Sequence, residues 1–388
     1  MRIYDDEIAF YRSEALKPAA PQAFSQENAR ETRPYQGIPG IEAGPDGSLY
    51  ATWYAGGNGE GPDNYVILSV SRDQGRAWKE VQCIAPEGKI RAYDPVIWFD
   101  PQGRLWWFWA QTYSQKIGNI FDGKCGVFCC CCEHPEKELK WSDPRRIADG
   151  IMMNKPTVDS NGNWLLPTAL WSCFPEILSE NEKKIAYSNV TISRDNGKTF
   201  EMLGSADVPE RTFDEHCIVE QKNGTLWMLV RCKYGIGESF SSDGGKTWSP
   251  GKPSIFGGPD SRFAIRRLKS GNLLLINHRI PHALPGEKLA PGMCARTNLC
   301  AWISGDDGKT WSGGMLISGD QNVAYPDIAQ DKDGKIYVIY DHDRYYCGDI
   351  LLASFTEDDV AAGRRVTPGS YLNLLISSTV PLEKRMKK

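Results

Sequence analysis

A polar residue followed by glycine recurs six times along this chain of 388 residues, each time ahead of a run of apolar residues. The six pairs stand at intervals of 47 to 63 residues: Asp46-Gly47, Gln102-Gly103, Asn161-Gly162, Asn223-Gly224, Ser270-Gly271 and Asp333-Gly334. Such a pair favours a tight turn, because glycine accepts the positive φ that the turn requires. A turn-and-strand unit with a period of about 50 residues is typical of propeller blades. The sequence therefore predicts an all-β fold, a six-bladed β-propeller of four-stranded antiparallel blades.

The repeats run from about residue 33 to about residue 350 without a linker. We therefore expect a single domain over residues 1–388. The first 30 or so residues are expected to supply an outer strand to the last blade or to pack on the surface, and a short helix is expected around Thr356–Gly363.

A second repeat has the pattern Ser-x-Asp-x-Gly-x-Thr-aromatic, with small variations. Its four copies are Ser71–Trp78, Ser193–Phe200, Ser241–Trp248 and Ser304–Trp311. The aspartate can accept hydrogen bonds from backbone amides, the glycine can take a positive φ, and the aromatic ring can pack back on the sheet. We expect these segments to be structural turns, with a degraded fifth copy at Glu133–Trp141.

Composition excludes some classes of protein and leaves others open. The net charge of -4 gives no reason to expect nucleic-acid binding, and no apolar run is long enough to cross a membrane. The start of the chain lacks a basic stretch followed by an apolar one, and 12 cysteines without a leader suggest reduced thiols in a cytoplasm. The run Cys129–Cys132 could suggest a metal site, but successive residues of a strand point to opposite faces. We expect neither a metal nor a cofactor.

The first strand of each repeat begins with polar or ionisable residues. In order these starts are Gln36–Pro39, Asp94-Pro95, Asn154–Pro156, Asp214-Glu215, Ser261-Arg262 and Tyr325–Asp327. The second strands end in further polar and aromatic residues, among them Trp171, Arg231, Asp341 and His342. Because the innermost strands of a propeller all begin at one face, we expect the active site there. Glu215 and Arg231 should lie side by side at one end of a hairpin.

The four Ser-x-Asp-x-Gly turns resemble the Asp-boxes of the sialidase (neuraminidase) superfamily. The resemblance implies roles for further residues. Glu215, 16 residues before Arg231, matches the glutamate and second arginine of the family. Arg296, ahead of the strand that leads to Ser304, matches the third arginine. Tyr325, eight residues before Asp333-Gly334, matches the nucleophile.

Blade one departs from the family pattern. The family opens this blade with Arg-Ile-Pro, whereas this chain has Gly37-Ile38-Pro39, so the first arginine is missing from its usual place. Arg33 or Arg262 is expected to supply the charge instead. The family's acid lies in the loop that here reads Gly56–Asn64, and we expect Glu60 as general acid, with Asp63 and then Asp94 as the alternatives.

The resemblance implies a retaining exo-glycosidase that cleaves a terminal acidic sugar, sialic acid or a related one, from an oligosaccharide or glycoconjugate. A neutral tyrosine oxygen suits an anomeric carbon that bears a carboxylate, since a carboxylate nucleophile would be repelled there. Glu215 would activate Tyr325, and Arg231 and Arg296 would hold the substrate carboxylate. His216, Trp171, His342 and Asp341 are expected to line the site. Two alternatives stay open: a lyase or a hydrolase of a non-sialic sugar on the same propeller, and a non-catalytic glycan-binding propeller.

Overall fold

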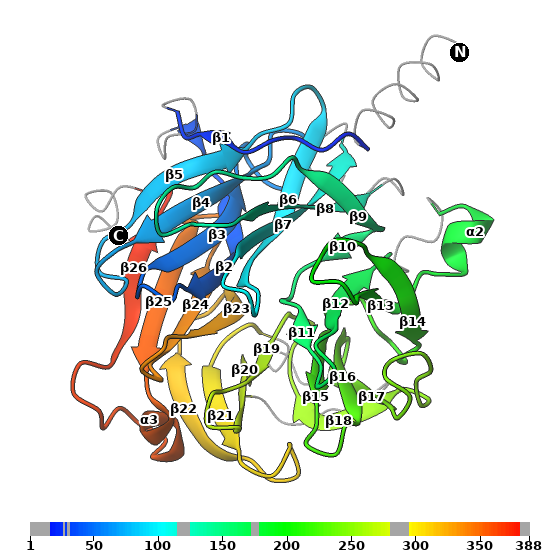
Figure 1. Cartoon of the computed structure of the whole chain (residues 1–388). Coiled ribbons are helices and arrows are strands. Elements are labelled where there is room, and N and C mark those ends of the chain that lie inside the picture. The colour runs from blue at the N-terminus through cyan, green and yellow to red at the C-terminus, as the bar shows by residue number, and fades with distance from the viewer. Residues whose placement is uncertain are drawn as a thin grey trace. The chain divides into compact units, whose positions relative to one another are not determined.

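Six antiparallel sheets make up the computed structural model, which describes residues 16–25, 28, 32–114, 125–171, 178–279 and 295–380 (Figure 1). The strands of the second, fourth, fifth and sixth sheets lie side by side in chain order. The first sheet has the order β1-β5-β4-β3-β2, and the third has the order β10-β12-β13-β14 with β11 paired to β12. The prediction of an all-β, six-bladed β-propeller is confirmed, although the first and third sheets have five strands rather than four.

The described strands fall into the six sheets as follows. The first sheet holds β1 (Gln22–Ala23), β2 (Gln36–Ala43), β3 (Leu49–Ala55), β4 (Tyr65–Ser71) and β5 (Lys79–Ile84). The second holds β6 (Ile90–Phe99), β7 (Leu105–Tyr113), β8 (Gly126–Cys132) and β9 (Arg145–Asp149). The third holds β10 (Ile151–Met152), β11 (Thr157–Val158), β12 (Trp164–Ala169), β13 (Ser188–Ser193) and β14 (Glu201–Ala206).

The remaining sheets have four strands each. The fourth holds β15 (Cys217–Glu220), β16 (Leu226–Cys232), β17 (Gly235–Ser241) and β18 (Lys252–Gly257). The fifth holds β19 (Ala264–Arg267), β20 (Leu273–His278), β21 (Leu299–Ser304) and β22 (Ser312–Ser318). The sixth holds β23 (Val323–Gln330), β24 (Ile336–His342), β25 (Asp349–Phe355) and β26 (Tyr371–Ser377). Two short helices are α2 (Glu180–Lys183) and α3 (Glu357–Ala361), and α3, capped by Thr356, confirms the predicted helix.

The chain divides into two compact units. Unit 1 draws on Met1–Ile151, Asp341–Leu351 and Leu375–Lys388, and unit 2 on Met152–Tyr340 and Leu352–Leu374. Unit 1 therefore contains the first two sheets, and unit 2 contains the fourth and fifth sheets with most of the third and sixth. A single domain over 1–388 stays a prediction.

The N-terminal strand does not join the last blade. Gln22 and Ala23 of β1 pair with Cys83 and Gln82 of β5, the outer strand of the first sheet. The outer position of the last sheet is taken by its own strand β26. For the described residues of this segment, the prediction of an outer strand for the last blade is therefore wrong, because β1 pairs with β5 and β26 already takes the outer position of the last sheet.

The hydrophobic core of unit 2 lies between neighbouring sheets. Met228 and Val230 of β16 pack in a cluster with residues of the third sheet, such as Val190. Trp227 and Leu229 of the same strand pack in a second cluster with residues of the fifth sheet. This alternation follows the two-residue period of a strand that is buried on both faces. The sheets of the unit are thus fixed against one another by apolar contacts, and their first strands, β15, β19 and β23, lie next to each other in that order.

The Asp-box segments all connect the last two strands of a sheet in chain order and share one hydrogen-bond pattern. The serine hydroxyl donates to the aspartate at 2.8 to 3.0 Å and accepts from the glycine amide at 2.8 to 2.9 Å. In three of the four, the tryptophan ring nitrogen donates to the glycine carbonyl oxygen. The side chains are used up in holding the turn, which supports the structural interpretation.

The cysteine run lies in β8, and all four of its residues are buried. Burial raises the pKa of Cys129 and of Cys131 to about 12, so both thiols are protonated near neutrality. The four cysteines pack as small apolar side chains in the interior.

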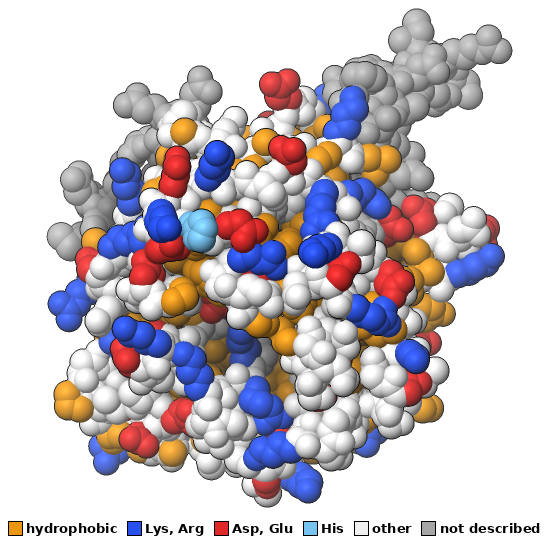
Figure 2. Space-filling model, in the orientation of Figure 1, with side chains coloured by type: hydrophobic (Ala, Val, Ile, Leu, Met, Phe, Trp, Pro, Cys, Tyr) orange, Lys and Arg blue, Asp and Glu red, His pale blue; other side chains and the backbone are white. Residues whose placement is uncertain are grey.

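On the face seen in Figure 2, acidic and basic side chains are interspersed, without a broad area of one charge. Within the part of the chain that is described, no helix is long and apolar enough to span a bilayer.

Candidate active site

Glu215 and Arg231 lie side by side, as the hairpin spacing predicts. Glu215 stands two residues ahead of β15, and Arg231 is near the end of β16, to which β15 pairs with Cys217 opposite Leu229. Nη1 of Arg231 donates to Oε1 of Glu215 at 2.7 Å. Both side chains are at least 96% buried, whereas Oε2 of Glu215 has no hydrogen-bond partner among the described residues. A buried carboxylate oxygen with spare acceptor capacity is well placed to take a proton.

Tyr325 brings its hydroxyl to this ion pair from β23. Nη1 of Arg231 donates to the hydroxyl oxygen at 3.3 Å, and the hydroxyl donates to Oε1 of Glu215 at 3.5 Å. The residue is buried and has φ 54°, which is a rare conformation for a bulky L-residue. Strained backbone of this kind persists only where the surroundings enforce it, and it clusters at functional sites.

Arg296 covers the ring of Tyr325. Its guanidinium carbon lies 5.2 Å from the ring centroid, within the range of a cation–π contact. The backbone sets this position, because the Val323 amide at the start of β23 donates to the Arg296 carbonyl oxygen at 3.1 Å. Arg231 lies 4.6 Å from the ring centroid of Phe213 in the same way.

Asp260, which sequence reasoning missed, joins the two arginines. Its carboxylate accepts from Nε of Arg231 at 2.5 Å, and its carbonyl oxygen accepts from Nη2 of Arg231 at 3.2 Å and from Nη2 of Arg296 at 3.0 Å. Burial alone would lower the pKa of Arg231, but Glu215, Tyr325 and Asp260 raise it above its ordinary value, so the guanidinium stays charged. A possible sequence signal was the stretch Gly257–Asp260, directly before the predicted Ser261-Arg262.

The backbone around Glu215 is held by Asn154 and Arg262. The amide of Asn154 donates to the carbonyl oxygens of Glu215 and His216 at 3.1 and 2.9 Å, and Nε of Arg262 donates to Asn154 at 2.9 Å. Arg262 is 2% exposed, so it orients the backbone that carries Glu215. The prediction that Arg262 binds substrate stays a prediction.

Asp214 is a second buried acid beside Glu215. It accepts from the Ser188 hydroxyl and lies 2.9 Å from Nε of Arg211. Burial raises the pKa of Asp214 to about 7, although Arg211 and the Ser188 hydrogen bond oppose the shift. With φ 47° it shares the left-handed conformation of Tyr325.

His216 and Trp171 also lie in unit 2, and both are buried. The two ring nitrogens of His216 each lie 2.8 Å from a backbone carbonyl oxygen, those of Asp214 and Asn189, and burial lowers its pKa. The indole of Trp171 packs edge-on against Phe213, with 5.3 Å between ring centroids. Both residues therefore support the loop around Asp214, and substrate contact by either stays a prediction.

Unit 1 contains a second carboxylate cluster, centred on Glu60. Oε1 of Glu60 accepts from the hydroxyls of Tyr54 at 2.9 Å, Tyr35 at 3.2 Å and Tyr345 at 3.3 Å. Nη2 of Arg344 lies 3.6 Å from it. Burial alone would raise the pKa of Glu60, but Arg344 and other neighbours lower it. The carboxylate is thus ionised in this state, whereas a general acid must carry a proton, so its catalytic role stays a prediction.

Arg344 also fills the space beside Gly37, where the resemblance to sialidases implies an arginine. A Cβ atom added to Gly37 would lie 2.9 Å from both Cβ and Cδ of Arg344, and 2.9 Å from Oδ2 of Asp341. Oδ2 of Asp341 accepts from the Ile38 amide at 2.9 Å. The start of β2 therefore has no room for a side chain at position 37 while Arg344 and Asp341 stay where they are. Neither Arg344 nor its proximity to Gly37 was predicted.

The other predicted site residues of unit 1 are Arg33, Asp63, Asp94 and His342. Arg33 is fully buried and forms an ion pair with Glu80, which accounts for its charge. Asp63 is exposed, and Asp94 is buried at a β-bulge of β6 with φ 48°. Nδ1 of His342 lies 3.3 Å from Asp349, and this hydrogen bond raises the pKa of His342 to about 10.

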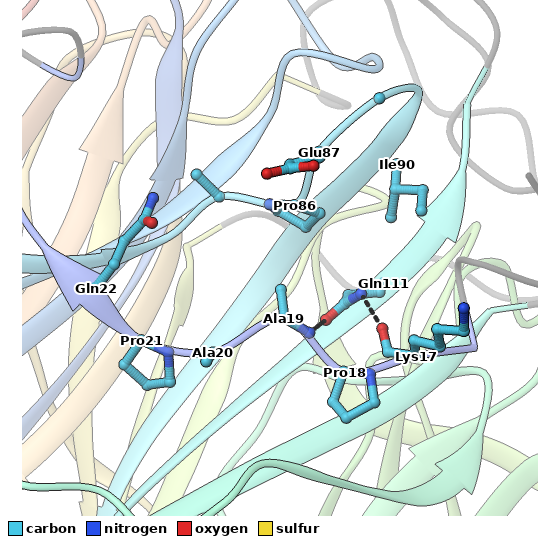
Figure 3. A pocket seen from close by; sticks show the side chains of 12 residues that line it. Lys17, Pro18, Ala19, Ala20, Pro21, Gln22, Pro86, Glu87, Ile90 and Gln111 are labelled. Atoms are coloured by element: carbon cyan, nitrogen blue, oxygen red, sulfur yellow. Dashed lines mark hydrogen bonds between the residues drawn. The ribbon is translucent and has the colours of Figure 1, made fainter.

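A cavity of about 530 Å³ also lies in unit 1 (Figure 3). It is lined by residues 17–22 and 85–88, Ile90 and Gln111, and Gln111 bridges the N-terminal segment by bonding the Ala19 amide and the Lys17 carbonyl. None of the predicted site residues lines this cavity. We therefore assign the candidate active site to the residues in contact with Tyr325 and not to this cavity.

Comparison with known proteins gives a family and a fold. The family model of the BNR repeat-like domain matches residues 47–338. Among curated protein sequences, none matches this chain.

Solved structures resemble the chain over most of its length. The intramolecular trans-sialidase from Ruminococcus gnavus, in complex with oseltamivir carboxylate, is 15% identical with a TM-score of 0.62, covering 88% of this chain and 98% of that one. The NanB sialidase from Streptococcus pneumoniae is 13% identical with a TM-score of 0.62, covering 89% and 71%. The Hadza microbial sialidase Hz136 is 16% identical with a TM-score of 0.60, and this chain, 79% of which is covered, spans 63% of its length. At such low identities the likeness shows the fold alone.

Proposed function

The chain belongs to the BNR repeat-like domain family, and from this premise we propose that it is a retaining exo-glycosidase of sialidase type that uses Tyr325 as nucleophile. The sialidases and the trans-sialidase among its structural neighbours support a glycoside as substrate. One observation carries the proposal: a buried tyrosine in a strained conformation shares its hydroxyl with a glutamate and an arginine.

In the proposed reaction, the oxygen of Tyr325 attacks the anomeric carbon of the sugar. The hydroxyl proton passes to Glu215, whose Oε1 already accepts it at 3.5 Å. Arg231 donates to the same hydroxyl oxygen and would stabilise the negative charge that develops as the proton leaves. The bond from the anomeric carbon to the leaving oxygen breaks, and a general acid protonates that oxygen. Water then attacks the tyrosyl–sugar intermediate and gives a proton to the conjugate base of the general acid, Tyr325 departs with the proton held by Glu215, and the configuration is retained.

We propose an acidic sugar as the substrate. Arg231 and Arg296 meet at the Tyr325 side chain, and a carboxylate on the sugar would be attracted to both guanidinium groups. Asp260 bonds to both of these arginines, so a substrate carboxylate would have to replace contacts that Asp260 now makes. Glu60 remains our first choice as general acid, ahead of Asp63 and Asp94.

The test is a panel of aryl glycosides of sialic acid, of related keto acids, of uronic acids and of deoxy sugars, incubated with the full chain. We expect release of the aryl group from an acidic sugar, and labelling of Tyr325 by a fluorinated analogue, detected in the peptide mass. Cleavage with labelling of another residue would refute the assignment of Tyr325. A sugar product that absorbs in the ultraviolet after separation from the aryl group, as an unsaturated sugar does, would show a lyase instead.

A further inference from the structure

We propose that His342, Cys347 and Asp349 form a binding site for one zinc ion in the turn that joins β24 to β25. None of the three residues has a part in the proposed reaction, although the sequence predicts that His342 lines the active site, and the argument for the zinc site does not depend on that reaction. In the described part of the chain, no other group of three or more His, Cys, Asp or Glu side chains gathers its potential ligand atoms so closely.

Two of the three distances between the side chains, those from His342, suit a tetrahedral ion. Nδ1 of His342 lies 3.3 Å from Oδ2 of Asp349 and 3.7 Å from Sγ of Cys347, and all the ligand atoms lie within 4.8 Å of one another. Tetrahedral zinc with ordinary bond lengths separates a nitrogen from an oxygen ligand by about 3.3 Å and from a sulfur ligand by about 3.6 Å. The histidine thus already has the required spacing to both partners.

The backbone of the turn is fixed without an ion. The amides of Tyr346, Cys347 and Gly348 all donate to the carbonyl oxygen of Asp343, at 2.9, 3.0 and 3.1 Å. This bonding closes the chain into a tight loop between His342 and Asp349. The three ligands are therefore presented by a short, well-defined segment, which reduces the entropy lost when an ion binds.

The C-terminal segment also holds the cysteine in place. The carbonyl oxygen of Cys347 accepts from the amide of Thr379 at 3.1 Å, from its hydroxyl at 2.9 Å and from the hydroxyl of Ser378 at 3.1 Å. The carbonyl oxygen of Gly348 accepts from Nε2 of the Gln36 side chain at 2.7 Å. Such outer contacts orient the residues that carry metal ligands.

The type of ligand selects the ion. A thiolate, an imidazole and a carboxylate together suit zinc, whereas magnesium and calcium prefer oxygen ligands alone. Asp349 and Cys347 are buried, while the His342 side chain is 27% exposed, so an ion here can be reached from solvent. Three protein ligands leave a fourth position for water.

An ion at this site would link the side chains of His342, Cys347 and Asp349 across the turn that carries Arg344 and Tyr345. Both residues contact Glu60, and Arg344 also fills the space next to Gly37. The simpler alternative is an ion pair between His342 and Asp349 with a thiol nearby. The two interpretations differ in whether Cys347 binds an ion: the zinc site needs its thiolate as a ligand, whereas the ion pair does not.

The test uses the full chain, loaded with zinc, desalted and analysed for metal content. We expect one equivalent of zinc in the wild type. In Cys347→Ser the affinity for zinc should fall by well over about tenfold, because losing a ligand should cost at least as much affinity as losing a residue that only orients a ligand. The matched control is Cys131→Ser, since Cys131 is a similarly buried cysteine outside the cluster. It should keep the zinc and the rise in the unfolding temperature that zinc produces.

Cobalt provides a second readout. Wild-type protein with cobalt should show the intense near-ultraviolet band of a cobalt–thiolate bond, and Cys347→Ala should lack it while far-ultraviolet circular dichroism confirms its fold. Should Cys347→Ser not fold, Asp349→Asn and His342→Gln are measured in the same way and should also lose the zinc. Wild-type protein that retains no zinc, or a folded Cys347 variant that retains it fully, would overturn the proposal.

Discussion

Two carboxylates in this protein have the same kinds of neighbour and differ in how these are arranged. Glu215 in unit 2 is 2.7 Å from an arginine and 3.5 Å from a single tyrosine hydroxyl. Glu60 in unit 1 is 2.9 to 3.3 Å from three tyrosine hydroxyls and 3.6 Å from its arginine.

The difference separates an arrangement suited to a nucleophile from one that surrounds an ionised carboxylate with hydrogen-bond donors. Burial raises the pKa of Tyr35 and of Tyr54 well above the ordinary value, so near Glu60 the tyrosines are held as hydrogen-bond donors. Near Glu215 the tyrosine is held at long distances and in a strained conformation, with an arginine next to its oxygen. Residue types alone do not distinguish the two clusters, whereas distances and backbone conformation do.

The strongest test of this comparison is Tyr325→Phe. We expect a loss of kcat of about 10⁴-fold or more, because removing a nucleophile abolishes the covalent step. Tyr337→Phe is the matched control, since its hydroxyl donates to Asp331 in the turn before β24, and it should retain activity. Near-normal turnover by folded Tyr325→Phe would show that the two clusters do not differ in the way described.

The next effect concerns Asp214, the buried neighbour of Glu215. Its folded pKa of about 7 lies above the unfolded value, so the folded state binds the proton more tightly. Asp214 therefore stabilises the folded state fully below its unfolded pKa near 4. This stabilisation is lost as the pH rises to about 7, which changes the free energy of unfolding by up to about 4 kcal/mol. Denaturant unfolding of wild type and Asp214→Asn between pH 4 and 8 measures this, and a constant difference in unfolding free energy would contradict it.

Replacing each carboxylate with its amide sharpens the comparison further. Glu215→Gln should lower kcat by about a hundredfold for every substrate, because the proton acceptor is lost. If Glu60 is the general acid, Glu60→Gln should slow the cleavage of substrates that have a sugar as leaving group. It should leave the cleavage of aryl glycosides unchanged, because an aryl leaving group needs no proton. Equal losses for both leaving groups would remove Glu60 from that role.

The smallest effect is expected at Gly37. Gly37→Ala should destabilise the protein by about 1 to 3 kcal/mol through overpacking against Arg344 and Asp341. Combining it with Arg344→Ala should cost less than the sum of the two single changes, as the double-mutant cycle measures. Strict additivity would mean that the two residues do not share the space.

Features encoded by local turns could be predicted from the sequence. The Asn223-Gly224 turn sets the register of β15 and β16, and this register alone brings Glu215 next to Arg231. The same reasoning located the Asp-boxes, since their hydrogen bonds run within eight residues.

Contacts between residues distant in sequence could not be predicted in this way. Asp260 meets Arg231 across 29 positions and Asp341 meets Ile38 across 303, and no periodicity encodes either pairing. The pairing of β1 with β5 was missed for the same reason, because an edge strand accepts any partner that reaches it. Such contacts depend on the conformation in which loops pack against the sheets. The residue types of the local turns do not determine that conformation.

The contacts of Asp260 have a consequence for how an anion would bind. Nε and Nη2 of Arg231 both bond Asp260, and Nη1 bonds Glu215 and Tyr325. An incoming carboxylate would therefore exchange with the Asp260 side chain, which is 37% exposed and can turn toward water. Because one anion replaces another, the charge next to the arginine changes little, and ionic strength should affect the affinity less than at a site that presents a bare guanidinium.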